Sequence, residues 1–206
     1  MASAWHPTDR RKAHATKDNS GRLGTRHDGR EGQVRLFPSS HMPPNVKDTN
    51  RKRSMRTTTT TARQLARYIV ARSDADGMPV NETRLQRMLY VLQVTFIRAS
   101  GGTLLFPDEF DARPCGPIVP SVHEEYVQNG SRPIYAHDAI MPDDIGLDSH
   151  AAAFIDDGIR TLRGMYPRDF VRITQGNGTP WSTAYKHGSM GHIGNDELIR
   201  AALREA

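Results

Sequence analysis

The sequence predicts a mainly α protein: a single compact helical domain with at most a small β-hairpin, preceded by a disordered N-terminal tail. Two observations support this fold class. Apolar residues recur at helical spacing after residue 58, most regularly in residues 81–100. Residues 1–56 lack that periodicity and are rich in Arg, Lys, His, Asp, Ser, Gly and Pro. Such a composition buries too little apolar surface to offset the entropy of folding. We therefore expect the domain over residues 58–206.

The charge is divided unevenly between these two regions. Residues 1–56 hold 13 Lys/Arg and 5 Asp/Glu, a net charge of +8, whereas the remaining 150 residues hold 15 and 18, a net charge of −3. The basic clusters at residues 10–12 and 51–53 could contact nucleic acid through its phosphates. A solvated tail is the simpler explanation, and so is a segment translated from a start codon upstream of the true start, for which Met55 is a candidate.

Several sequence features bear on the compartment. No apolar run approaches the 18 or so residues that a membrane span needs. The first 20 residues have no apolar core of the kind found in signal peptides. Cys115 is the only cysteine, so an internal disulfide is excluded and a reducing compartment fits. We predict a soluble cytoplasmic protein.

Local signals place the helices. A first helix is expected over about residues 60–72 with a threonine cap, and a second begins at an Asn81 cap and ends at Gly101-Gly102, because glycine adopts the left-handed cap conformation easily. Four later helices are expected, and two of them begin with a proline, which suits the first helical position. These later helices are expected from Pro120 to Asn129-Gly130, over about residues 149–166 after Asp148 or Ser149, from Pro180 after a Thr179 cap, and from Asn195 or Asp196 onward.

The β-structure is weaker. Residues 104–112 form one candidate strand, and residues 133–140 form a second that could pair with it. Gly116-Pro117 is expected to form a turn, and Pro167 is expected to end a helix and begin a short turn with Phe170.

The candidate chemical motifs do not form a recognisable active site. His123-Glu124-Glu125 lacks the second histidine of a helical zinc site, and His187 and His192 have no third ligand at suitable spacing. Cys115 has no histidine partner, so a small residue in a turn is the better explanation than a nucleophile. We therefore predict no catalytic residue, no metal ligand, no cofactor and no enzyme activity.

Four sequence blocks, which follow one another in a characteristic order, indicate the kind of domain. They are Leu85-Gln86-Arg87-Met88-Leu89-Tyr90 with Gln93, then Phe110-Asp111-Ala112, then Gly116-Pro117-Ile118-Val119-Pro120-Ser121-Val122, and finally Thr174 with Pro180-Trp181. Together they resemble the Panacea domain, the antitoxin module of many bacterial and phage toxin–antitoxin pairs. The resemblance covers about residues 58–206 and does not extend to the tail. We expect most of these motif residues to be structural, with Trp181 packed between helices and its indole N–H near a carbonyl group.

The resemblance implies a protein-binding function. Panacea domains neutralise a co-encoded toxin by direct contact, and the toxins include translation-blocking enzymes. Related proteins also act as adaptors that present the partner to a protease. The first alternative is a nucleic-acid-binding or autoregulatory protein that uses the basic N-terminal arm. The second is a small hydrolase whose site the sequence motifs do not reveal.

A mildly acidic domain could cover the basic surface of such a toxin. On this reasoning the partner-contact candidates lie around the helix that follows the Gly-Pro turn, although ordinary solvated charges are the competing explanation. The candidates are Asp108, Glu109, His123, Glu124 and Glu125, with Glu124 and Glu125 expected to be the most exposed.

Overall fold

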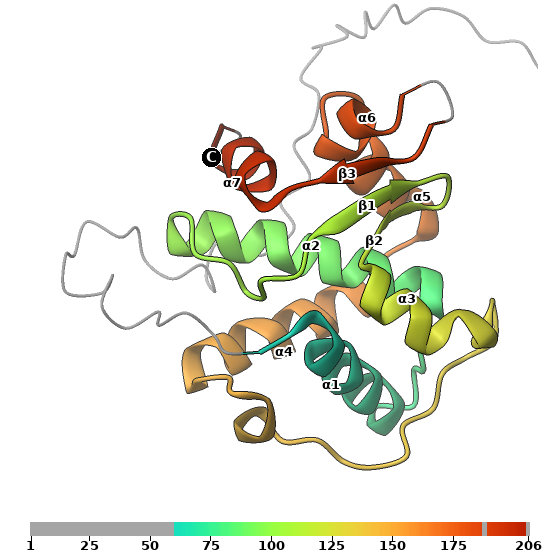
Figure 1. Ribbon diagram of the computed structural model, residues 1–206. Coiled ribbons are helices and arrows are strands. Elements are labelled where there is room, and N and C mark those ends of the chain that lie inside the picture. The colour runs from blue at the N-terminus through green and yellow to red at the C-terminus, as the bar shows by residue number, and fades with distance from the viewer. Residues whose placement is uncertain (1–59, 187–188, 205–206) are drawn as a thin grey trace, which may run out of the picture. The chain divides into compact units, whose positions relative to one another are not determined.

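The computed structural model describes residues 60–186 and 189–204, so the predicted tail, residues 1–56, lies outside the described residues. Within them the chain forms seven α-helices, two short 3-10 helices and one three-stranded sheet (Figure 1). This confirms the mainly α class. The helices are α1 (Ala62–Ala75), α2 (Glu82–Ser100), α3 (Pro120–Tyr126), α4 (Ser149–Arg163), α5 (Pro167–Gln175), α6 (Pro180–Ala184) and α7 (Asn195–Arg204), with η1 (Val127–Asn129) and η2 (Pro142–Ile145) as the 3-10 turns.

Helix α2 runs through the middle of the fold. Figure 1 shows α1 and α4 on one side of it, with α7 and the sheet on the other. A surface helix buries one apolar stripe, whereas a helix covered from several sides is buried over most of its circumference. Helix α2 is of the second kind. Its buried residues are Leu85, Gln86, Met88, Leu89, Tyr90, Val91, Leu92, Gln93, Thr95, Phe96 and Ile97.

The ends of the first two helices follow from their caps. The side chain of Thr61 accepts a hydrogen bond from the Gln64 N–H, and the Gln64 side chain accepts one from the Thr61 N–H, forming a capping box at the start of α1. The Asn81 side chain caps α2 as predicted, and Gly101 ends that helix in the left-handed conformation with φ of 73°. Helix α1 begins and ends two or three residues later than predicted.

The sheet differs from the predicted hairpin. Strand β1 (Phe110–Arg113) lies between β2 (Gly116–Ile118) and β3 (Gly191–Ile193), antiparallel to both, with Ala112 opposite Pro117 and Gly191. The prediction that residues 133–140 pair with the first strand was wrong, because that segment forms no strand. Strand β1 pairs instead with β3 and with the Gly-Pro segment itself, and the turn lies two residues earlier than predicted, at Pro114 and Cys115.

Helix α6 and strand β3 approach each other closely. A Cβ atom at Gly191 would collide with the backbone carbonyl oxygen of Ala184. This close approach is the reason that Gly191 must be a glycine. Its backbone conformation is not the reason, because its φ is not positive.

Two other boundaries were predicted incorrectly. Pro167 begins α5 rather than a turn, because proline fits the first helical position, where no N–H is needed. Helix α4 ends at Arg163, three residues earlier than predicted, and Arg84 binds the carbonyl oxygens there. None of the described helices has the length and apolar character needed to cross a membrane.

Candidate functional site

Gln86 joins the first block of the sequence motif to the third. Its side-chain oxygen accepts a hydrogen bond from the Val119 N–H at 2.8 Å, and its side-chain nitrogen lies 3.4 Å from the Val119 carbonyl oxygen. The Gln86 side chain is buried. A buried amide that pairs with both polar groups of one backbone residue substitutes for a missing β-strand partner. Gln86 therefore fixes the point where β2 passes into α3.

Gln93 binds the backbone of a second extended segment in the same way. Its side-chain oxygen accepts hydrogen bonds from the N–H groups of Leu105, at 2.9 Å, and Phe106, at 3.3 Å. Its side-chain nitrogen donates to the Phe106 carbonyl oxygen at 2.9 Å. These bonds hold the segment that leads into β1. Next to them the Tyr90 and Phe110 rings meet edge to face, with centroids 5.2 Å apart.

The Gly-Pro block lies against α2. Gly116, with φ of 121°, and Pro117 are both buried in β2. Pro120 occupies the first turn of α3, where Val122 is buried. The block therefore turns the chain from the sheet into a helix that packs on α1 and α2.

The last block closes on the same hairpin. The indole N–H of Trp181 donates to the Arg113 carbonyl oxygen at 2.9 Å, as expected for a partly buried tryptophan, and its ring stacks on Tyr185. Pro180 begins α6 after the Thr179 cap. The Thr174 hydroxyl, which is buried, donates to the Phe170 carbonyl oxygen at 2.8 Å. The second and third blocks thus form the β1–β2 hairpin, the first block lies on α2 against it, and the last block binds it through Trp181.

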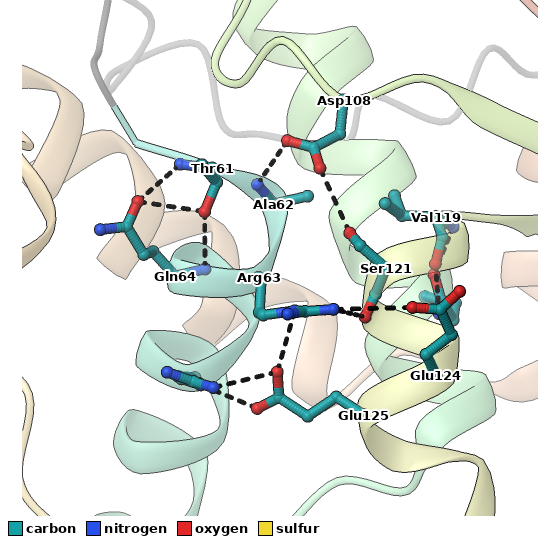
Figure 2. Close-up of polar contacts among 11 residues, drawn as sticks. Thr61, Ala62, Arg63, Gln64, Asp108, Val119, Ser121, Glu124 and Glu125 are labelled. Carbon is teal, nitrogen blue, oxygen red and sulfur yellow. Dashed lines mark hydrogen bonds and ion pairs between the residues drawn. The ribbon is translucent and has the colours of Figure 1, made fainter.

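Three of the acidic contact candidates, Asp108, Glu124 and Glu125, contact polar groups of the chain itself, as Figure 2 shows. Asp108 accepts hydrogen bonds from the Ala62 N–H at 2.9 Å and from the Ser121 hydroxyl at 3.2 Å. A carboxylate at this position satisfies an N-terminal amide of α1 and interacts favourably with its helix dipole. Asp108 therefore ties α1 to α3.

Glu124 and Glu125 differ sharply. Glu125 lies 2.7 Å from the Arg67 Nε and 3.2 Å from the Arg63 Nε, and its side chain is only 21% exposed. The prediction that Glu125 is among the most exposed acids was wrong, because these two arginines of α1 cover it. Glu124 is 75% exposed and lies 3.7 Å from the Arg63 Nη2. The hydrogen bond to Glu125 raises the pKa of Arg67.

Glu109 holds the C-terminal region of the chain to β1. Its carboxylate accepts a hydrogen bond from the Asn195 N–H at 3.0 Å and pairs with the His192 Nε2 at 2.7 Å. The hydrogen bond from the Asn195 N–H is the main cause that lowers the pKa of Glu109, and the pairing with His192 lowers it further. The hydrogen bond with Glu109 is the main cause that raises the pKa of His192, and the more distant Asp111 raises it further, whereas burial lowers it. His123, the remaining candidate, pairs with Glu82 at 2.8 Å between Nδ1 and Oε1.

Two arginines that no sequence motif singled out, Arg63 and Arg67, form the ion pairs with Glu124 and Glu125. Arg63 and Arg67 stand four residues apart on α1, so they share one face of the helix. That spacing was a readable signal of a paired basic surface. Arg84 was also missed: it donates to the carbonyl oxygens of Leu162, Arg163 and Met165, which satisfies the C-terminal end of α4.

Among the described residues no group of three or more His, Cys, Asp or Glu side chains is placed to hold a metal ion. Cys115 lies in the turn between β1 and β2, where its side chain is exposed. Comparisons with protein-family models, curated proteins and solved structures found no match.

Proposed function

We propose that the protein is an antitoxin that neutralises a toxin by direct protein–protein contact. The observation that carries the proposal is the mutual contact of the four blocks that resemble the Panacea domain. Gln86 of the first block binds Val119 of the third, and Trp181 of the last binds the backbone next to the second. Blocks that contact one another across about 100 residues of chain act as one structural unit, which favours the resemblance over chance matches of short motifs.

A growth experiment tests this function. The gene next to that of the protein would be expressed in bacteria from an inducible promoter, alone and together with the protein. We expect the neighbour to arrest growth alone and growth to recover on co-expression. A neighbour that leaves growth unchanged, or an arrest that the protein does not relieve, would count against the proposal.

Direct contact distinguishes an antitoxin from a regulator of toxin synthesis. The two purified proteins should form a complex of defined stoichiometry in size-exclusion chromatography with light scattering. If the protein instead acts as an adaptor that presents the toxin to a protease, the half-life of the toxin in cells should shorten whenever the protein is present. Because a translation-blocking toxin acts in the cytoplasm, the proposal places its antitoxin there.

The charge of residues 1–56 favours nucleic-acid binding as a second candidate function. A net charge of +8 in a short segment attracts phosphates, and such binding weakens steeply as salt rises. Binding of duplex DNA from the promoter of the operon should therefore be strong at low salt and lost when residues 1–54 are deleted. Binding that survives this deletion would assign the activity to the helical domain.

A further inference from the structure

The connection between η1 and α4 is long but firmly attached. Residues 133–148, called here the 133–148 connection, contain no regular structure except the single turn η2. The Ile134 N–H donates to the Val80 carbonyl oxygen at 2.8 Å, and the Ala136 N–H donates to the Asp74 carboxylate at 3.0 Å. Long ordered connections inside a domain are uncommon and usually functional.

Apolar side chains of this connection divide into two groups. Ile134, Ile145 and Leu147 are buried and anchor it to the core. Tyr135 is 63% exposed and Met141 is 62% exposed, although both have large apolar surfaces. An attached segment that presents an aromatic ring and a flexible thioether to solvent has the composition found at the centres of protein interfaces.

The acidic side chains of the 133–148 connection have no cationic counterparts within it at pH 7. It contains Asp138, Asp143, Asp144 and Asp148 and no lysine or arginine. Asp148 caps α4, and Asp144 accepts a hydrogen bond from the Met141 N–H. Within the described region of the chain, Asp138 and Asp143 make no ion pair and are exposed. No arginine or lysine among the described residues therefore neutralises their charge, whereas two arginines of α1 pair with Glu125.

We propose that the 133–148 connection is the surface on which the protein holds its partner, a protein that offers basic side chains around apolar recesses for Tyr135 and Met141. This inference rests on the proposed antitoxin function and replaces the surface around Glu124 and Glu125 as the contact region. The apolar anchors hold the complex together, because a few buried large side chains carry most of the binding energy at an interface. The aspartates accelerate association with a basic surface.

Matched variants test the anchors. Tyr135→Ala with Met141→Ala is compared with Tyr166→Ala with Met190→Ala, since Tyr166 is 66% exposed and Met190 is 63% exposed elsewhere on the surface. Both double variants should melt like the wild type, because exposed side chains contribute little to stability. Binding to the purified product of the neighbouring gene is then measured. We expect Kd to rise at least about tenfold for the first variant and to stay unchanged for the second.

A footprint tests what covers the surface. Full-length protein is treated with hydrogen peroxide, with and without the neighbouring gene product, and oxidation of Met141 and Met190 is followed by mass spectrometry. We expect both to be oxidised at similar rates in the protein alone, and the partner to protect Met141 only. Slow oxidation of Met141 in the protein alone would show that its own chain or a second copy covers the connection, and would overturn the inference.

The outcomes separate the two proposals. If the wild type neither binds the neighbouring product nor relieves its toxicity, the antitoxin function fails, and the contact surface fails with it. If the wild type binds and relieves toxicity while the two double variants bind equally well, the antitoxin function stands and only the contact surface is refuted.

Discussion

Gln86 and Gln93 lie seven residues apart on α2, and each uses its side-chain amide to bind the backbone of a different extended segment. Gln86 holds Val119, and Gln93 holds Leu105 and Phe106. Two turns of helix separate them, so both amides leave the same face of α2. Side chains here perform the hydrogen bonding that a neighbouring strand performs in a larger sheet.

The first prediction concerns this pair. Replacing Gln93 by leucine keeps much of the volume but leaves the buried polar groups of Leu105 and Phe106 without partners. Each such group costs about 1–3 kcal/mol, so Gln93→Leu should destabilise the fold more than Gln86→Leu, which affects one residue. Urea unfolding followed by circular dichroism measures the difference. Equal losses for the two variants would show that water replaces the Gln93 bonds.

The second prediction separates burial from contact at the motif residues. Leu89 is fully buried, so Leu89→Ala should cost about 2–5 kcal/mol. Trp181 is only partly buried, and Trp181→Phe should cost about 1 kcal/mol for its hydrogen bond to Arg113. Any loss of binding to the proposed toxin partner should follow the loss of stability measured by thermal melting. A Trp181→Ala variant that melts like the wild type but no longer binds would make Trp181 a contact residue.

The third prediction distinguishes the two acids of α3. Glu125→Lys places a third positive charge beside Arg63 and Arg67, whereas Glu124→Lys changes an exposed charge. Glu125→Lys should lower the free energy of unfolding by about 1 kcal/mol, and Glu124→Lys by much less. The loss should shrink when salt is raised from about 0.05 M to about 1 M, because salt screens exposed charges. Equal and salt-independent effects would exclude the ion pairs as the cause.

The fourth prediction is a pH dependence at His192. Its pKa is raised in the folded protein, chiefly by Glu109, so the stabilisation is complete below the unfolded pKa of about 6.5 and is lost as pH rises through the folded value. The pKa of Glu109 is lowered, so its share is complete above about 4.3 and is lost as pH falls through the folded value. His192→Gln should therefore cost more stability at about pH 5.5 than at about pH 8.5.

The exposed pair of His192 and Glu109 should contribute at most about 1 kcal/mol to the free energy of unfolding. Urea unfolding of both proteins at the two pH values measures the difference. A cost that is the same at both pH values would mean that the imidazole acts through packing alone.

The fifth prediction is that residues 1–54 are dispensable for folding. The described core begins with Ala62, and its first cap is the Thr61 side chain. A protein that starts at Met55 should keep its helical circular dichroism and its melting temperature within about 2 °C, since about 1 kcal/mol would already shift it by about 2–4 °C or more. A larger drop would show that the deleted segment contributes to stability.

Local sequence signals predicted the helices better than the sheet. The Asn81 cap and Gly101 bound α2 as expected, because a cap depends on residues within one turn. The partner of β1 was predicted wrongly, since pairing depends on which distant segment reaches it, and β3 arrives about 80 residues later. The motif drew attention to Gln86 and Gln93, but their role as backbone partners became visible only in the fold. Glu125 was predicted to be exposed because Arg63 and Arg67, which pair with it, lie on another helix about 60 residues earlier in the sequence.

The position of α7 has a consequence for synthesis of the chain. It packs on α2, where the Arg98 guanidinium donates to the Ala202 carbonyl oxygen. A ribosome makes α2 about a hundred residues before α7, so one side of the central helix stays uncovered until nearly the whole domain has been translated. Proteins are made at roughly 5–20 residues per second, so this interval lasts several seconds. During it, the nascent chain presents an apolar helix that chaperones and proteases can recognise.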